Sequence, residues 1–465
     1  MDSHPNEPDD PLTPAGRLFL HPEMNVIIHC VFGFKNPIDV AQAKSTIRDS
    51  LMVQHPRFSS LMVRDSRGFE HWRKTHIDID RHVIVVSQDH NIVSVNDYVA
   101  ELSVSSPLSY DKPLWEIHVL EGHNCAVFRI HHALGDGISL MSMLLASCRL
   151  AADTEALPTV GVAGNRRDNS LGRNWREIVG GFVKMIWFSL MFCIEFVLTS
   201  LWVCDRKTAI SGGAGVELWP RKLATATFVL EDMKAVKRAF DNATINDVLF
   251  GVVSFGLSRY LDHRSPNVAL PEGLRITGVA MINLRQQPGL QAQELSEMMK
   301  RKKSGSRWGN KFGILLLPVY YHKAGPDPLA YLRRAKAMID RKKRTLEGHF
   351  SYRIGYLVMS WFGSKFASML NYRIVCNTSF TISNLVGPQE EITLAGNPVT
   401  YIRANTSSIA HALTMHVVSY AGRADMQILV AKDIIPDPEF LAKCFEDALL
   451  EMKEAATAAE VSNKI

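Results

Sequence analysis

The stretch HHALGDG, residues 131–137, decides the fold, because it joins two segments of opposite character. The apolar run Cys125–Ile130 before it predicts a short strand, and Ile138–Leu150 after it carries apolar residues at the spacing of a helix. Asp136 and Gly137 are residue types that favour turns, and Gly137 suits an unusual backbone angle. A strand that turns directly into a helix, in a chain that mixes the two throughout, predicts an α/β fold.

The two adjacent histidines of this stretch indicate acid–base chemistry rather than metal binding. Successive residues of an extended segment point to opposite faces, so His131 and His132 are poorly placed to bind one metal ion together. One of them should face a cavity while the other faces the local packing. A neutral imidazole can accept a proton from an alcohol or amine that attacks a thioester. A pair of core histidines beside a turn is the alternative interpretation.

No GxSxG elbow occurs in the chain, so a serine-based covalent route has no obvious nucleophile. Direct attack by a bound acceptor needs no nucleophile from the protein. It needs a tunnel that brings both substrates to the histidine.

Two mixed parts flank a hydrophobic insert. We expect an N-terminal domain at residues 1–160, a linker at 161–220 that contains a hydrophobic helix at 178–204, and a C-terminal domain at 221–465. The expected strands are Val26–Gly33, Val83–Val86, Cys125–Ile130, Ala224–Leu230, Ile276–Asn283, Phe312–Val319, Phe380–Ile382 and Ile428–Lys432. The expected helices are Val40–Val53, Val95–Leu102, Ile138–Leu150, Thr244–Tyr260, Pro328–Leu346 and Pro438–Ala455.

The insert predicts contact with a membrane. Met185–Cys204 is a 20-residue window with a single charge, Glu195, and about 20 apolar residues suffice to cross a bilayer core. A charge in the middle of a span is costly, and basic residues on both flanks give no orientation. One span would also place the two parts of the chain on opposite sides of the membrane. We therefore expect the helix to lie in the interface or to re-enter; a buried core helix is the alternative.

The composition excludes several classes of protein. The chain has 465 residues, of which 52 are Lys or Arg, 47 are Asp or Glu, and 46% are hydrophobic. These values exclude a disordered chain, a collagen and a small disulfide scaffold. A net charge of +5 spread over such a length does not indicate a nucleic-acid partner. The seven cysteines include no CxxC pair, so neither a disulfide framework nor a zinc site is predicted.

Taken together, the motifs resemble the wax ester synthase/diacylglycerol acyltransferase family, and in particular its plant branch of WSD-type O-acyltransferases. The motifs that carry this resemblance are HHALGDG, Pro113-Leu114-Trp115, Asn246-Asp247, PLTP at 11–14 through Phe19, INLR at 282–285, RWGN at 307–310 and SNLVGP at 383–388. The resemblance covers nearly the whole chain. The wider superfamily of CoA-dependent acyltransferases includes BAHD enzymes and condensation domains, but the DFGWG motif of the BAHD branch is absent.

The resemblance implies two chloramphenicol-acetyltransferase-like domains with a tunnel between them. It implies that His132 is the general base, that His131 is its structural neighbour, and that Gly137 permits the turn. Asp136 is expected to turn away from the acceptor and to hold the loop through an arginine. Asn246 is expected to shape the tunnel or to stabilise the developing oxyanion. The residues implied to contact substrate are Asp247, Pro113, Leu114, Trp115, Ser383 and Asn384.

The implied reaction moves a long-chain acyl group from acyl-CoA to a fatty alcohol, and also to diacylglycerol. No bound cofactor or metal is expected, and acyl-CoA serves as co-substrate. The expected location is the endoplasmic reticulum membrane with the active site facing the cytosol, with the plasma membrane as the alternative. Two other functions stay open: an acyltransferase for a soluble alcohol or amine, and a non-catalytic acyl-CoA or lipid-binding protein.

Three of the implied motifs also have purely structural interpretations. Thr244–Asp247 fits the capping box that starts many helices. Pro113-Leu114-Trp115 precedes a strand and needs no catalytic reason. The Gly-Pro pair that ends the stretch 383–388 is typical of turns in general.

Overall fold

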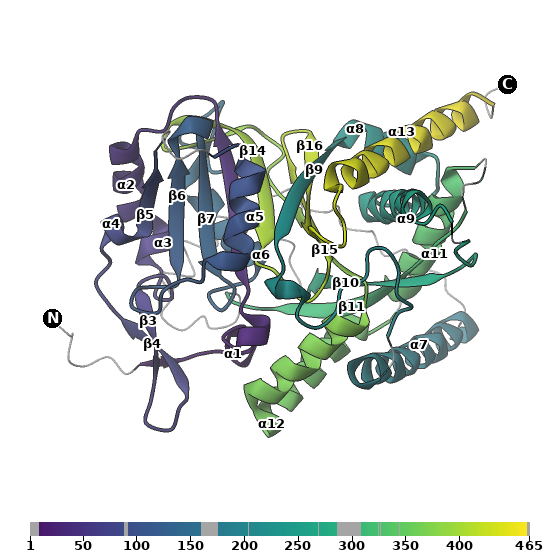
Figure 1. The fold of residues 1–465 in the computed structure, drawn as a ribbon, viewed down its shortest axis with the longest axis horizontal. Helices are drawn as coiled ribbons and strands as arrows, with labels where there is room; N and C mark the ends of the chain where they lie inside the picture. Colours follow the sequence, from purple (N-terminus) through teal and green to yellow (C-terminus); the bar gives the residue numbers. More distant parts are fainter. Residues whose placement is uncertain are drawn as a thin grey trace.

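The computed structural model describes residues 9–87, 92–159, 175–202, 204–267, 269–285, 308–323, 325, 327–343 and 345–462. The first residues of the expected linker and Arg307 of the RWGN motif lie outside these ranges. The chain forms two large sheets that lie side by side, with helices on their outer faces (Figure 1).

The first sheet has seven strands in the order β5-β6-β7-β2-β14-β13-β8. Their bounds are β5 Val83–Val86, β6 Trp115–Leu120, β7 Cys125–His131, β2 Ile27–Phe34, β14 Asn397–Thr406, β13 Ile392–Leu394 and β8 Cys148–Leu150. Helices of this half are α1 Pro14–Leu18, α2 Val40–Arg48, α3 Leu51–Gln54, α4 Ile79–His82, α5 Val95–Ser105 and α6 Gly137–Ala146, with the 3-10 turns η1 Pro22–Met24 and η2 Glu121–His123. A small sheet of β1 Asp10–Pro11, β4 Glu70–Lys74 and β3 Ser60–Arg64 lies at its edge.

The second sheet has six strands in the order β11-β10-β12-β15-β16-β9. Their bounds are β11 Phe312–Tyr320, β10 Arg275–Asn283, β12 Phe380–Val386, β15 Leu413–Tyr420, β16 Arg423–Ala431 and β9 Arg221–Val229. Its main core packs the sheet against α8 Leu230–Arg238, α9 Ile245–Arg264, α11 Leu329–Lys343 and α13 Pro438–Ser462. The 3-10 turn η3 Val216–Leu218 precedes β9.

Strands β13 and β14 cross from the C-terminal part of the chain into the first sheet. β14 pairs antiparallel with β2, from Val399 opposite Phe34 to Thr406 opposite Ile28. The sequential division into domains 1–160 and 221–465 therefore does not describe the sheets, because residues 392–406 complete the N-terminal one. The division misses the crossover because β14 finds its partner more than 350 residues away in the sequence, where local patterning carries no information.

Three expected helices have different bounds in the structure. The expected helix Val40–Val53 is two helices, because Ser50 caps α3 with its hydroxyl on the Val53 amide. The expected helix Ile138–Leu150 ends at Ala146, and its last three residues form β8. The hydrophobic helix expected at 178–204 is α7 Trp175–Leu201.

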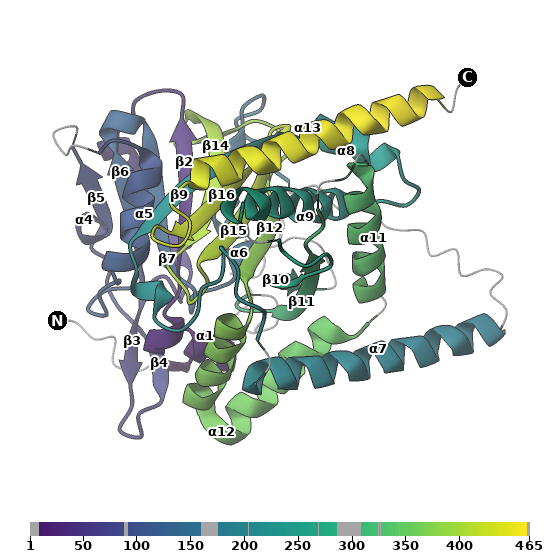
Figure 2. The same ribbon diagram turned by 45° about the vertical axis from the view of Figure 1, so that its right-hand side comes forward.

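A long helix that the sequence analysis did not anticipate, α12 Glu347–Asn377, contacts α7 along one edge of the molecule (Figure 2). It bends at Gly363, where φ is 81° and ψ is 166°, a backbone conformation that is essentially restricted to glycine. The bend divides α12 into a first limb at 347–362 and a second limb at 364–377.

Six buried histidines make the stability of the fold depend on pH. Burial lowers the pKa of His55, His131 and His411 to about 3 and that of His82 and His416 to about 4, and it places the pKa of His29 well below 6.5. Below pH 6.5 the unfolded chain binds protons that the folded chain does not, so stability falls as pH decreases from 6.5 toward 4. Each histidine contributes a loss of up to about 1.4 kcal/mol per pH unit in this window.

We therefore expect the melting temperature to be clearly lower at pH 5.5 than at pH 7.5, measured by thermal unfolding in buffers of equal ionic strength. Between pH 7.5 and 8.5, where these histidines are neutral in both states, it should change little. A melting temperature that stays constant down to pH 5.5 contradicts this expectation.

Candidate active site

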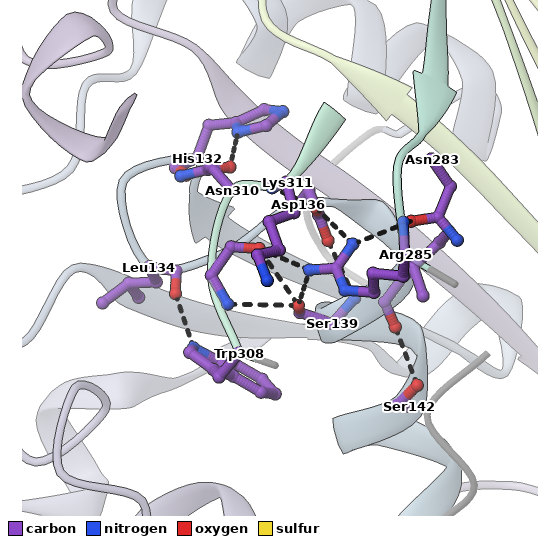
Figure 3. A network of polar contacts seen from close by, with 12 residues as sticks. His132, Leu134, Asp136, Ser139, Ser142, Asn283, Arg285, Trp308, Asn310 and Lys311 are labelled. Carbon is purple, nitrogen blue, oxygen red and sulfur yellow. Dashed lines mark hydrogen bonds and ion pairs between the residues drawn. The ribbon is translucent and has the colours of Figure 1, made fainter. Parts of the chain in front are cut away.

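The site forms where a turn of the first half of the molecule contacts a loop of the second half. The HHALGDG turn connects β7 to α6, and the segment Trp308–Lys311 precedes β11 (Figure 3). Trp308 Nε1 donates to the Leu134 carbonyl oxygen at 2.9 Å, and the Ser139 hydroxyl lies 3.3 Å from both the amide nitrogen and the carbonyl oxygen of Gly309. Further contacts of His132 and Asp136, described below, complete the junction.

Asn310 fixes the tautomer of His132. The Asn310 amide group donates to the His132 carbonyl oxygen at 2.9 Å, which turns its Oδ1 toward His132 Nδ1 at 3.0 Å. His132 Nδ1 must then carry the proton, because Oδ1 can only accept. No described residue hydrogen-bonds Nε2 of this ring, which is left as the basic nitrogen.

The surroundings of His132 keep the ring neutral and hold it in place. Phe19 stacks on it at 4.0 Å between ring centroids, and Phe312 meets it edge-on at 5.9 Å. Burial lowers the pKa of His132 from its ordinary value of 6.5, while the Asp136 charge acts in the opposite direction. The ring is therefore unprotonated at neutral pH, as a general base must be.

His131 points into local packing, as expected from the alternation of an extended chain. Its Nδ1 accepts from the Ala133 amide at 3.1 Å, so Nε2 is the protonated nitrogen and donates to Asn25 Oδ1 at 2.9 Å. These contacts satisfy both nitrogens and tie the turn to the segment before β2.

Asp136 is held by an arginine, and that arginine is Arg285. Arg285 Nη1 lies 2.8 Å from Asp136 Oδ2, and both side chains are buried. The same carboxylate caps α6 through the Ser139 amide at 3.0 Å and accepts from the Lys311 amide at 2.9 Å. Arg285 also donates to the Gly309 carbonyl oxygen at 2.7 Å. One buried ion pair thus joins the turn of the first half to the loop of the second (Figure 3).

Gly137 does not adopt the unusual backbone angle that the sequence analysis expected. It is the first residue of α6, and its φ is not positive. A Cβ added there would meet only Leu385, at an ordinary 3.9 Å. The glycine of this junction with a left-handed conformation is Gly309, with φ of 106°, where an added Cβ would lie 2.9 Å from Arg57 Nη1.

A cavity of about 230 Å³ opens beside His132 between the two halves. Its wall is mainly apolar, with side chains from α1, β2, α6, β10 and α12. The polar side chains that line it include His132, Asp136, Asn371, Ser383, Asn384, Asn405 and His416. Ser383 and Asn384 thus lie where the resemblance implied. A second cavity of about 300 Å³ lies between α2 and the first sheet, and no residue of the HHALGDG turn lines it.

Asn246 and Asp247 start α9 and do not line the cavity at His132. Asp247 forms a capping box with Thr244: its carboxylate accepts from the Thr244 amide at 2.6 Å, and its own amide donates to the Thr244 hydroxyl. The structure thus gives Asp247 the role of a helix cap, and its contact with substrate stays a prediction. Asn246 Oδ1 accepts a hydrogen bond of 2.8 Å from Asn384, so Asn246 positions a residue that lines the cavity.

Pro113, Leu114 and Trp115 are also not among the residues that line this cavity, and their contact with substrate stays a prediction. Leu114 and Trp115 are fully buried in the core of the first half, and Trp115 Nε1 donates to the Phe58 carbonyl oxygen at 2.8 Å. The motif supports β6, whose neighbour β7 carries the histidines.

The sequence analysis quoted Arg285, Asn310 and Phe19 within motifs but assigned none of them a role. Spacing could not identify them, because Asn310 lies 178 residues from His132 and Arg285 lies 149 residues from Asp136. His416, which also lines the cavity, carries no motif at all. Across the described residues, no group of three His, Cys, Asp or Glu side chains could hold a metal ion.

Substitution of Asn310 tests how much the orientation and tautomer of His132 contribute to kcat. Asn310→Ala removes the acceptor that selects the tautomer, and we expect kcat to fall by about 10²-fold, as for a misplaced catalytic group. Asn310→Asp keeps an acceptor and should recover part of kcat. Its carboxylate should also move the acidic limb of the pH–rate profile to higher pH, because a negative charge raises the pKa of His132. A wild-type kcat in Asn310→Ala would show that the hydrogen bond between Asn310 and His132 does not contribute to catalysis.

Comparison with known proteins identifies the family of this chain. Residues 34–189 match the model of the wax ester synthase/diacylglycerol acyltransferase catalytic domain, and residues 308–453 match that of the WS/DGAT C-terminal domain. Wax ester synthase/diacylglycerol acyltransferase 11 of Arabidopsis thaliana is 36% identical, with 96% of this chain and 95% of the relative covered. Wax ester synthase/diacylglycerol acyltransferase 2 of the same plant is also 36% identical, with 97% and 96% covered.

Solved structures confirm the expected fold of two chloramphenicol-acetyltransferase-like domains. The wax ester synthase/diacylglycerol acyltransferase from Marinobacter aquaeolei VT8 is similar with a TM-score of 0.61 at 19% identity, over 96% of this chain and 100% of that one. The first condensation domain of the CDA synthetase is similar with a TM-score of 0.54 at 14% identity, over 95% and 97%.

Proposed function

Because the chain belongs to the wax ester synthase/diacylglycerol acyltransferase family, we propose that it moves a long-chain acyl group from acyl-CoA to a fatty alcohol, and also to diacylglycerol. The observation that carries this proposal is the state of His132. The ring is neutral, its Nδ1 is bound by Asn310, and it lines an apolar cavity. A lipid acceptor would fill such a cavity with its chain and present its hydroxyl to Nε2.

The reaction needs one proton acceptor and no covalent enzyme intermediate. His132 Nε2 takes the proton of the acceptor hydroxyl as the oxygen attacks the thioester carbonyl carbon. The tetrahedral intermediate then collapses to the ester and expels the thiolate of CoA. The imidazolium returns its proton to this sulfur, so the products are an ester and CoA, and His132 ends neutral. Asp136 stabilises the imidazolium from a distance while its ion pair with Arg285 holds the turn.

Donors for the negative oxygen of that intermediate should come from β12. The Ser383 hydroxyl and the Asn384 amide both line the cavity, and the contact with Asn246 orients Asn384. Preorganised donors of this kind typically contribute about 10²–10³-fold to kcat. We assign them this role because a negative oxygen in this mainly apolar cavity needs hydrogen-bond donors from the protein.

We also propose that α7 holds the protein on a membrane without crossing it. α7 is the one helix in the described residues that is long and apolar enough to span, through Val179–Thr199. A span would separate the two halves, yet β14 and the Asp136–Arg285 pair join them. Glu195 of α7 pairs with Arg275 of β10, which neutralises the one carboxylate in its apolar window. The location that goes with this is the endoplasmic reticulum membrane, with the active site facing the cytosol.

An assay of the purified protein tests the reaction. Palmitoyl-CoA is offered with hexadecanol or with dioleoylglycerol in mixed micelles, and the esters are separated by thin-layer chromatography, with His132→Ala as the matched control. We expect wax ester with the first acceptor and triacylglycerol with the second. If palmitoyl-CoA binds but no ester forms, the result would indicate a non-catalytic lipid-binding protein. Transfer to small soluble alcohols or amines alone would indicate the other acyltransferase class.

A further inference from the structure

Helix α12, which precedes β12 of the second sheet, presents large apolar side chains to solvent. At its bend, Trp361 is 77% exposed and Phe362 is 63% exposed. The other exposed apolar residues of α12 are Tyr356, Leu357, Phe366 and Met369. Single exposed apolar residues are normal on a protein surface, but a continuous group of them marks an interaction site.

Exposed apolar side chains also occur along α7, which packs beside α12 (Figures 1 and 2). The exposed apolar residues of α7 are Val179, Phe182, Val183, Ile186, Trp187, Leu190, Met191, Ile194, Val197 and Leu198, with Trp202 just after it. We call the exposed side chains of the two helices the α7–α12 face. Trp187 of α7, Trp202 just after it and Trp361 at the bend of α12 are exposed, and tryptophan favours the boundary between lipid headgroups and acyl chains.

The charges on the α7–α12 face fit a lipid surface. Lys184 of α7 and Arg353, Lys365 and Arg373 of α12 are exposed cations. The carboxylates described on the two helices are both neutralised within the protein, Glu195 by Arg275 and Glu347 by Lys342. Exposed lysines and arginines beside an apolar surface favour a membrane that carries anionic lipid.

The opposite side of α12 reaches the catalytic histidine. Ala367 and Val375 of the second limb are buried with Phe19, whose ring stacks on His132. Asn371, Ile374 and Val375 line the cavity itself. The second limb of α12 therefore has an exposed side and a side that lines the cavity of the reacting group.

We propose that α7 and α12 form a single membrane-docking face, which rests on one bilayer leaflet and lets a lipid acceptor reach the cavity beside the second limb of α12. The choice of lipid acceptor rests on the proposed function, whereas the docking itself does not. An anchor made of α7 alone would leave Trp361 and Phe362 in water.

Flotation with vesicles tests the docking. The full chain is mixed with phosphatidylcholine vesicles, with or without phosphatidylserine, and compared with Trp361→Glu/Phe362→Glu. We expect the wild type to float with both kinds of vesicle, and more strongly with phosphatidylserine. The variant should partition at least about tenfold less, because burial of each ring contributes enough for a tenfold change or more. The matched control is Val229→Glu/Leu450→Glu, two residues that are 52% and 50% exposed outside the α7–α12 face; it should float like the wild type.

A pair of substrates separates docking from catalysis. Hexanoyl-CoA with hexanol is soluble, whereas hexadecanol is embedded in the vesicles. The α12 variant should keep wild-type rates on the soluble pair and lose at least about tenfold on the embedded acceptor, in line with its partitioning. If neither pair is converted by the wild type while flotation behaves as expected, the proposed function fails and the docking stands.

Three results would overturn the docking proposal. The first is a wild type that does not float. The second is an α12 variant that floats fully, while Phe182→Glu/Trp187→Glu does not, since α7 alone would then be the anchor. The third is a wild-type dimer that dissociates in the α12 variant, which would make the α7–α12 face an interface between two copies of the chain.

Discussion

His132→Ala should lower the rate of ester formation by about 10²–10⁴-fold, the usual contribution of a general base. The loss follows from the structure because Nε2 is the nitrogen left free by the Asn310 contact and the ring lines the cavity. The measurement is initial rate with palmitoyl-CoA and hexadecanol at saturating concentrations. The KM for the alcohol should change much less than kcat, since proton transfer belongs to the transition state.

His131→Ala is the matched control for this experiment. His131 is an adjacent histidine with both nitrogens bonded inside the protein, so its loss should appear as a lower melting temperature more than as a lower kcat. The mechanism is wrong if His132→Ala melts like the wild type and remains fully active.

Arg285→Met should destabilise the folded protein by about 3–5 kcal/mol, because it leaves the buried carboxylate of Asp136 without its partner. It also removes the contact with the Gly309 carbonyl oxygen, which keeps the loop of Asn310 against the turn of His132. We therefore expect loss of activity together with the lower stability. Urea unfolding at pH 7.5 gives the free energy, and ester formation gives the rate.

A double substitution shows whether the unpaired charge causes the damage. Arg285→Met/Asp136→Asn removes both charges and should recover part of the stability lost in Arg285→Met. Arg285→Lys keeps the charge but supplies fewer fixed donors, so it should fall between the wild type and Arg285→Met. Arg285→Met with wild-type stability would mean that water or another cation replaces the guanidinium.

Local patterns in the sequence predicted the elements whose cause is local. The Thr244–Asp247 capping box starts α9 where the pattern placed it, and the apolar window 185–204 lies mostly in α7. The sequence did not predict α12, because its apolar residues occur on several sides of the helix. Some face solvent, some face the cavity and some contact Phe19. A helix with three environments has no clear amphipathic period.

The candidate site likewise contains residues that a local motif identified and residues that only the folded chain brings together. His132 and Asp136 stand in one short motif, which predicted that one histidine faces a cavity; the resemblance to the family then implied the roles of His132 and Asp136. Asn310 and Arg285 act on them across the junction of the two halves, and only the folded chain shows which side chains meet there. Trp115 shows the limit of a motif shared with a family: the motif marks the residue, but only the folded chain shows that Trp115 is fully buried and bonded to the Phe58 carbonyl oxygen.

The late position of β14 in the chain has a consequence for synthesis. The first sheet lacks two of its seven strands until residue 406 has left the ribosome, so β2 would remain an open edge through most of translation. A nascent chain in this state, which already carries the apolar α7, depends on membranes or chaperones to avoid pairing with its neighbours. The two halves mature together, and a fragment that ends in the linker should aggregate instead of folding as a smaller protein.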